Sequence, residues 1–289
     1  MSVIEVLSPG LYTTVQDRGR TRFRSFGIPV SGCMDQLSAD LGNNLLDNDS
    51  NAPVLEITMM GPQLLFQDKA NIVITGADLS ARIDGKLLKT NTIVTINSGD
   101  VLSFGKLKYG CRTYLCIQNG FDVPAHFGSC SAYEKAQLGL PVLKKGMKLY
   151  YQNNSTPIFH QNSRIKPSNL LFEENTVDVV PGPEYHLMNE KLLSETFEIT
   201  RDSNRMGYRL KGVLSYSHSG SILTSTVMPG TVQLPPSGDP VVLMKDCQTT
   251  GGYPRILQVT EMGINILAQK KPGDQIKFTL KTLPEGRQS

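Results

Sequence analysis

The sequence predicts a mainly β protein made of two β-barrel-like domains with a few short helices. Glycine (26) and proline (17) interrupt the 289-residue chain so often that short strands are favoured over long helices. Hydrophobic residues make up 39% of the chain, which is enough for packed cores, and the length exceeds that of one usual core. Closed sheets are expected because closure removes exposed strand edges.

The predicted strands are short β-branched or alternating apolar runs that lie between turns. Three further runs each follow a glycine and one other residue, a pattern typical of a turn that leads into a strand. Whether these three reflect an internal duplication stays open. The first group covers residues 72–75, 92–96, 112–118, 176–180, 241–244 and 256–260, and the second covers 99–104, 146–150 and 273–278.

Two helices are predicted. Met34, Leu37, Leu41 and Leu45 have helical spacing after Asp35, an N-cap residue type, and predict a helix near residues 36–46. Pro183 suits a first helical turn, and the following apolar residues predict a second helix that opens the C-terminal half. The polar segment 153–169 is the candidate linker, so the expected domains are 1–160 and 170–289.

Composition excludes several classes of function. A net charge of +3 is too small to indicate a nucleic-acid-binding face, and apolar runs of at most four residues are too short for a membrane span. Glu5 lies where a signal peptide would need an apolar core. Five cysteines without C-x-x-C spacing favour reduced thiols and a cytoplasmic location, and the four scattered histidines argue against a protein-bound metal.

Two N-terminal stretches carry groups suited to anion binding. Arginines occupy every second position from Arg18 to Arg24 and would share one face if the stretch were extended; a solvated hairpin is the alternative. Residues 28–35 form a loop before a helix N-terminus, where backbone amides favour an anion. Asp35 fits a helix cap better than an acid or base, and Ser31 does not qualify as a triad nucleophile.

A third constellation lies in the C-terminal half, where residues 203–210 are followed by 246–255. Gly251 and Gly252 allow close backbone approach to a ligand, while ordinary turn chemistry explains them equally well. The stretch matches neither a Walker A loop nor a dinucleotide-binding fingerprint. Lys245 lacks the context of a biotinylated lysine, and Cys247 is expected to be a buried structural thiol.

Together these stretches resemble one family, that of the C component of the bacterial ATP-dependent 5-oxoprolinase, also called KipA. The resemblance covers nearly the whole chain and includes the carboxyltransferase-like region of urea amidolyase. Departures from the family pattern occur at Gln118, Cys130 and Asn204. The matching motifs are residues 9–11, 13–17, 19–20, 27–29, 31–35, 55–58, 75–78, 112–115, 122–124, 128–129, 181–183, 205–210 and 248–254.

The resemblance implies a cyclophilin-like barrel in at least the C-terminal domain and a function as one subunit of a hydrolase complex. That complex, which also contains the A component and a homologous B component, converts 5-oxoproline to L-glutamate with hydrolysis of ATP. It also implies that this chain is inactive or nearly so alone, that ATP with Mg²⁺ is used, and that this chain carries no covalent biotin. Two alternatives stay open: the carboxyltransferase component of a biotin-dependent urea carboxylase-type system, and a KipA-type regulatory protein that binds a histidine-kinase inhibitor.

The candidate site residues lie in the motifs that carry the resemblance, and their roles are hypotheses from their chemistry. Arg20 and Arg205 are expected to stabilise phosphate or carboxylate charge, and Asp17 or Asp35 to orient a metal ion or a proton transfer. The expected binding residues, including the anion-cradling loop of residues 249–252, are Ser31, Tyr208, Gln248, Thr249, Thr250, Gly251, Gly252 and Tyr253.

Overall fold

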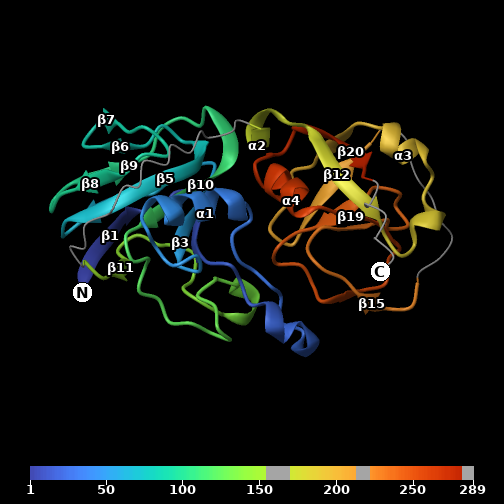
Figure 1. The fold of residues 1–289 in the computed structure, drawn as a ribbon, viewed down its shortest axis with the longest axis horizontal. Helices are drawn as coiled ribbons and strands as arrows, with labels where there is room; N and C mark the ends of the chain where they lie inside the picture. Colours follow the sequence, from blue (N-terminus) through green and yellow to red (C-terminus); the bar gives the residue numbers. More distant parts are fainter. Residues whose placement is uncertain (154–169, 213–221, 282–289) are drawn as a thin grey trace, which may run out of the picture. The chain divides into compact units, whose positions relative to one another are not determined.

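The computed structural model describes residues 1–153, 170–212 and 222–281, and the chain divides into two compact units (Figure 1). The first unit consists of Met1–Arg20 and Ser31–Phe172. The second consists of Glu173–Ser289 together with Thr21–Val30, a segment from the N-terminal part of the sequence. Except for residue 153, the predicted linker lies outside the described residues.

The first unit contains two antiparallel sheets. In the six-stranded sheet the strand order is β11-β1-β4-β9-β6-β7, and in the five-stranded sheet it is β2-β3-β10-β5-β8. The strands of the first sheet are β1 (Ser2–Ser8), β4 (Gln63–Phe66), β6 (Arg82–Ile83), β7 (Lys86–Leu87), β9 (Val101–Ser103) and β11 (Lys148–Tyr151). Those of the second are β2 (Tyr12–Gln16), β3 (Val54–Thr58), β5 (Ala70–Asp78), β8 (Val94–Ile96) and β10 (Tyr109–Ile117).

The core of this unit takes side chains from both sheets, and the central strands of the second sheet are buried on both faces. In β5, Ile72 and Ile74 join the main core, whereas Val73 faces the other way and packs in a second cluster with Cys116 of β10. Successive strand side chains point to opposite faces. Burial on both faces therefore explains why β5 and β10 contain continuous apolar runs.

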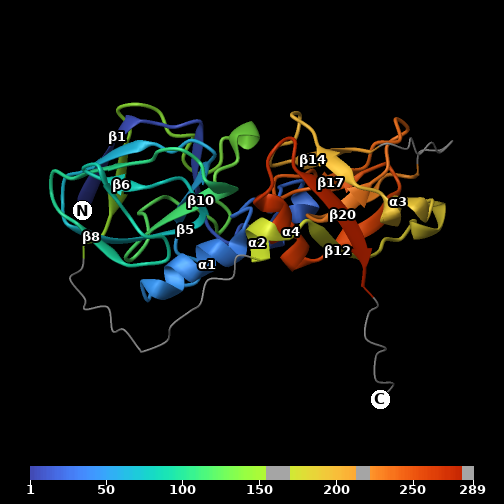
Figure 2. The ribbon, with the colours of Figure 1, turned by 90° about the horizontal axis from the view of Figure 1, so that it is seen from above.

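Helix α1 (Gln36–Leu45) covers the outer face of the second sheet, and Figure 2 shows it running along β5 and β10. The side chain of Asp35 caps this helix by accepting a hydrogen bond from the Ser38 amide, 3.0 Å away. The predicted helix and its N-cap are both confirmed. Within the helix, Gly42 lies against the Cys116 thiol and allows a close approach between helix and sheet.

The second unit is a closed barrel with strand order β12-β19-β16-β17-β14-β13-β20. Neighbours pair antiparallel except for β12 and β20, which pair parallel. A ribbon of β15 (Ser225–Thr226) and β18 (Thr250–Gly251) accompanies it. The barrel strands are β12 (Thr176–Pro181), β13 (Phe197–Ile199), β14 (Gly207–Lys211), β16 (Thr231–Gln233), β17 (Val241–Leu243), β19 (Arg255–Val259) and β20 (Gln275–Leu280).

The prediction of a mainly β fold with few helices is confirmed, and a closed barrel occurs in the second unit. The three glycine-led runs contain β9, β11 and β20, and each glycine has a positive φ, near +81° to +91°, which explains why glycine suits these turns. Sequence reasoning missed α4 (Glu261–Ala268), which packs against β12 and is capped by the Thr260 side chain.

The second predicted helix does not form as one continuous helix. The structure has two short pieces instead, a 3-10 turn η3 (Tyr185–Leu187) and helix α3 (Lys191–Ser194), after the short α2 (Leu170–Glu173). Met188 is extended between the pieces, and the Asn189 side chain accepts a hydrogen bond from the Lys191 amide. Such a local bond competes with helix continuation. The apolar spacing nevertheless identified two buried residues, Met188 and Leu192.

The arginine-rich stretch is not extended, so its arginines do not form one cationic face. Strand β2 ends at Gln16, and residues Thr21–Phe26 form the 3-10 helix η1. Arg18 is half exposed and pairs with Asp40 at 2.6 Å, whereas Arg20 is buried. Arg24 donates to the carbonyl oxygen of Val227 within the second unit. The remaining short element is the 3-10 turn η2 (Glu134–Ala136).

Candidate functional site

Asp17 organises a loop cluster in the first unit. Its Oδ1 accepts hydrogen bonds from the Gly19 amide at 2.8 Å and from the hydroxyls of Ser129 and Ser131 at 2.6 and 2.5 Å. Its Oδ2 accepts from the Cys130 amide at 2.6 Å. The carboxylate is almost fully buried, and hydrogen bonds to a charged acceptor are the stronger kind. These contacts favour a positioning role for Asp17 over proton transfer.

Arg20 and Ser31 lie at the same cluster. The buried Arg20 guanidinium donates to the carbonyl oxygens of Ser131 and, at 3.4 Å, His126. Ser31 is fully buried in the left-handed region, with φ 55°, and its hydroxyl has no hydrogen-bond partner among the described residues. The amide of Cys33 donates to the carbonyl oxygen of Asp17 at 2.9 Å. The loop before α1 is therefore anchored on the Asp17 loop.

A buried polar network continues beyond Asp35. The Asp35 amide donates to the Tyr114 hydroxyl at 2.8 Å, and that hydroxyl donates to Glu56 at 2.9 Å. Glu56 also accepts from the Met34 amide at 2.7 Å and lies 3.7 Å from the Arg112 guanidinium. Burial, reinforced by the Glu56 and Asp35 charges, raises the pKa of Tyr114 well above its ordinary value. Asp35 thus serves as a helix cap inside a structural network.

Arg205, in the second unit, forms a bidentate ion pair with Asp246. The Nε–Oδ2 distance is 2.7 Å and the Nη2–Oδ1 distance is 3.1 Å, with both side chains more than nine-tenths buried. The Asp246 amide also donates to the Arg205 carbonyl oxygen at 2.8 Å. The pair joins the loop before β14 to the loop after β17, and Arg205 does not line the adjacent pocket.

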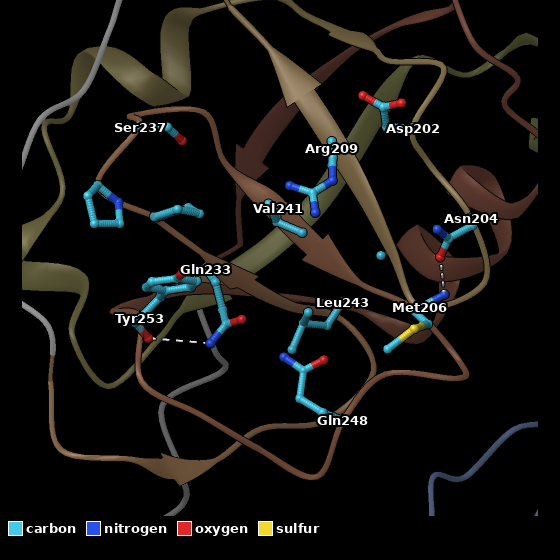
Figure 3. Close-up of a pocket in the computed structure, with 13 residues that line it drawn as sticks. Asp202, Asn204, Met206, Arg209, Gln233, Ser237, Val241, Leu243, Gln248 and Tyr253 are labelled. Atoms are coloured by element: carbon cyan, nitrogen blue, oxygen red, sulfur yellow. Dashed lines mark hydrogen bonds between the residues drawn. The ribbon is translucent and has the colours of Figure 1, made fainter. Parts of the chain in front are cut away.

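That pocket has a volume of about 450 Å³ and lies against β14, β16 and β17 (Figure 3). Its apolar wall includes Met206, Val241 and Leu243. Two charged residues line it, Asp202 and Arg209, and their side chains form no ion pair with each other among the described residues. The other lining residues are Asn204, Gly207, Gln233, Pro235, Pro236, Ser237, Gln248 and Tyr253.

The structure separates the predicted binding residues of the second unit. Gln248 and Tyr253 line the pocket, whereas Tyr208 is buried on the opposite face of β14. Thr250 and Gly251 form strand β18, and the Thr249 carbonyl oxygen accepts from the Val227 amide. A Cβ on Gly251 would lie 2.6 Å from Gln233 Nε2, whereas one on Gly252 would have no neighbour nearer than 3.5 Å. Gly251 therefore shapes the pocket indirectly.

Sequence reasoning missed several pocket residues, above all Arg209 and Gln233. Arg209 lies within the motif 203–210, and its alternation with Gly207 around the buried Tyr208 could have indicated a shared face. Gln233 carried no sequence signal, because its place in the pocket depends on strand pairing between β16 and β17.

Two further chemical properties concern thiols and metals. Burial raises the pKa of Cys247 to about 12, which agrees with a structural thiol rather than a nucleophile.

Across residues 1–153, 170–212 and 222–281, no group of three or more His, Cys, Asp or Glu side chains has the arrangement of a metal site. The same residues include no helix with the length and apolarity needed to cross a bilayer.

The barrel with its polar pocket and the two-sheet unit define a protein of the carboxyltransferase-like class. A family model for the carboxyltransferase domain, subdomain A and B, matches residues 26–280, so the chain belongs to this family. It is 35% identical to the C component of 5-oxoprolinase from Escherichia coli (strain K12), over 98% of this chain and 93% of that protein.

Urea amidolyases are also relatives. The chain is 33% identical to the urea amidolyase of Lachancea kluyveri, over 95% of this chain but 17% of that protein. The crystal structure of the K. lactis urea amidolyase superposes with a TM-score of 0.86 at 29% identity, over 97% of this chain and 19% of that one. The chain is thus homologous both to one part of a multi-subunit hydrolase and to one region of a much longer enzyme.

Proposed function

We propose that this chain is the C component of an ATP-dependent 5-oxoprolinase, which acts with the A and B components to convert 5-oxoproline to L-glutamate. The observation that carries the proposal is the 35% identity to the Escherichia coli protein, which spans 98% of this chain and 93% of that protein. A relationship over nearly the full length of both chains supports a shared role as a separate subunit. The chain is expected to be inactive or nearly so without its partners.

The chemistry explains the need for ATP. A five-membered lactam is a poor electrophile, and transfer of the ATP γ-phosphoryl group to its carbonyl oxygen would activate the ring carbon. One water then adds to that carbon and the C–N bond breaks, leaving an acyl phosphate. A second water releases phosphate, so the products are L-glutamate, ADP and phosphate. Mg²⁺ would be held mainly by the phosphates of ATP, as is common for nucleotide-dependent enzymes.

The contacts of the predicted catalytic residues support positioning roles. Asp17, Arg20 and Asp35 each bind neighbouring loop atoms in the first unit, and Arg205 is paired with Asp246 in the second. The charged and amide side chains that line the pocket of the second unit support the binding of a small polar substrate there. The five cysteines of the chain are all free thiols, which supports the expected reducing, cytoplasmic location.

A second candidate is the carboxyltransferase component of a biotin-dependent urea carboxylase-type system. The observation that favours it is the TM-score of 0.86 to the K. lactis urea amidolyase. This candidate requires a separate biotinylated carrier as a partner. Its discriminating result would be carboxyl transfer to an amide that depends on such a carrier and not on ATP-driven opening of a lactam.

The test is to purify this chain with its candidate A and B components and to measure the release of ADP and L-glutamate in the presence of 5-oxoproline. We expect both products from the complex of all three proteins, and loss of both when this chain is omitted. Full activity from the A and B components alone would contradict the proposal. Preparations without 5-oxoproline and without ATP serve as controls for unrelated ATP hydrolysis.

A further inference from the structure

The strand register of the second unit places a cation and an amide at opposite ends of one row of side chains. Arg209 of β14 is the register partner of Val241 of β17, which is in turn the partner of Gln233 of β16. Cross-strand partners point to the same face, and two strand spacings amount to roughly 10 Å. All three residues line the pocket, with the apolar Val241 between the two polar ones.

Arg209 can accept an anionic ligand without first losing a protein partner. Its side chain is exposed to the pocket and forms no hydrogen bond or ion pair among the described residues. The guanidinium fork suits a carboxylate, which it can bind through two parallel hydrogen bonds. Asp202, the other charged lining residue, would oppose an anion by repulsion and is exposed to solvent.

Gln233 supplies the opposite end. This residue is only 2% exposed, yet its Oε1 accepts no hydrogen bond among the described residues, and its Nε2 makes only a 3.4 Å contact with the Tyr253 carbonyl oxygen. Because Gln233 lines the pocket, its open Oε1 acceptor can take a hydrogen bond from a ligand N–H. Gln248 also lines the pocket, and in the view of Figure 3 its amide points toward the side on which Gln233 is drawn, with Arg209 drawn on the other side.

We propose that this pocket binds a small molecule that carries both a carboxylate and an amide, with Arg209 holding the carboxylate and Gln233 and Gln248 the amide. Val241 and Leu243 contact the hydrocarbon between the two groups. The pocket's volume of about 450 Å³ suits a small organic ligand. The identification of that ligand as 5-oxoproline rests on the proposed function; the chemical class rests on the pocket.

Three small molecules with five-membered rings serve as probes that test the two ends of the pocket separately. 5-Oxoproline carries the carboxylate and the lactam amide, 2-pyrrolidinone has only the amide, and cyclopentanecarboxylate has only the carboxylate. Binding to the full chain is measured by ligand-observed NMR titration, and binding to the complex with the A and B components is measured in the same way. We expect 5-oxoproline to bind at least tenfold more tightly than either of the other two probes.

Each variant should change the affinity of only those probes that carry the group its residue is proposed to contact. Arg209→Met should weaken 5-oxoproline and cyclopentanecarboxylate by about 10- to 100-fold, the value of a charge-assisted contact, and leave 2-pyrrolidinone unchanged. Gln233→Met should weaken 5-oxoproline and 2-pyrrolidinone and spare cyclopentanecarboxylate. Asp202→Asn should tighten both carboxylates. Arg201→Met removes an equally charged, exposed residue outside the pocket lining and should change none of the affinities.

Failure of binding by 5-oxoproline in both the chain and the complex, or unchanged affinity in Arg209→Met, would overturn the inference. If Gln233→Met does not fold, as judged by circular dichroism, the exposed Arg209 variant still decides. If the complex opens 5-oxoproline and its activity is unchanged by both Arg209→Met and Gln233→Met, the pocket assignment is wrong and the proposed function still holds. If the chain binds the three probes with the predicted selectivity but the complex is inactive, the proposed function is wrong and the pocket assignment still holds.

Discussion

Gly251 leaves the space in which the Gln233 amide lies, because a Cβ at Gly251 would be 2.6 Å from Gln233 Nε2. The atom that a methyl group would displace is the end of a flexible side chain. Gly251 belongs to the glycine pair that the sequence suggested for close ligand approach. It makes room for a polar residue of the pocket.

Gly251→Ala should move the Gln233 side chain with little loss of stability. We expect the side-chain amide resonances of Gln233 to shift and the affinity for 5-oxoproline to fall, while the thermal midpoint changes by only a few degrees. Gly252→Ala adds the same methyl group where the nearest atom is 3.5 Å away, so it should leave the Gln233 resonances in place. Unshifted Gln233 resonances in Gly251→Ala would contradict the geometry.

Arg205→Ala should destabilise the second unit by about 3–5 kcal/mol, because it leaves the buried Asp246 carboxylate without its ion-pair partner. Urea-induced unfolding measures this loss. The double variant Arg205→Met with Asp246→Leu removes both charges and should recover most of the stability.

The activity of the same double variant separates two roles of Arg205. If the reconstituted complex regains turnover together with stability, Arg205 acts by holding the loops before β14 and after β17. A stable complex with turnover reduced by orders of magnitude would instead mean that the Arg205 charge acts on the reacting groups. Arg205→Ala with wild-type stability would contradict the importance of the pair with Asp246.

Glu184 should contribute stability that depends on pH. Its carboxylate accepts from Arg255 Nε at 2.9 Å and Nη2 at 2.7 Å, and these bonds hold the pKa of Glu184 below its ordinary value of 4.5. A carboxyl group with a depressed folded-state pKa stabilises the fold above its unfolded-state pKa. That contribution is lost as the pH falls through the lower, folded-state pKa.

Glu184→Gln should therefore lower the free energy of unfolding at pH 7 by about 1–3 kcal/mol. This difference from the wild type should shrink as the pH falls through the lowered folded-state pKa of Glu184. Urea titrations at pH 7 and pH 3 provide the comparison. Glu190→Gln, which changes an exposed carboxylate in the same segment, should have little effect at either pH. A difference for Glu184→Gln that does not vary with pH would exclude the charged contact as its cause.

Gly42→Ala should destabilise the first unit even though alanine favours helices. The added Cβ would overlap the Cys116 thiol across the interface of α1 with the sheet. Overpacking of this kind costs typically 1–3 kcal/mol, against a helix-propensity gain of about 1 kcal/mol. Asn44→Ala, on an exposed position of the same helix, should instead be neutral or slightly stabilising.

The overlap at Gly42 can be tested by removing its other partner. In the double variant Gly42→Ala with Cys116→Ala, the new methyl group occupies space left by the thiol, so we expect part of the lost stability to return. Chemical denaturation of the four proteins in this cycle gives the coupling energy. Strict additivity of the two substitutions would contradict direct contact between these positions.

Local signals predicted those parts of the fold that depend on neighbouring residues in the chain. Asp35 caps α1 as expected because N-capping involves atoms only three residues apart. The glycine-led turns before β9, β11 and β20 were also predicted correctly, because a turn depends on residues that are close together in the chain. The prediction of the second helix was wrong because the Asn189 side chain accepts a hydrogen bond from the Lys191 amide. Such a local bond competes with the helix and cannot be detected from the spacing of apolar residues.

By itself, the sequence determined the mainly β class and the capped helix α1. It also determined the family relationship, through the motifs at residues 205–210 and 248–254. Only the tertiary structure decided which of their side chains meet. Arg209 and Gln233 lie 24 positions apart on different strands, and the register of β14 and β16 with β17 brings them to one pocket. Pairing in a closed barrel sets that register through contacts across the whole sheet, so no local pattern could have revealed it.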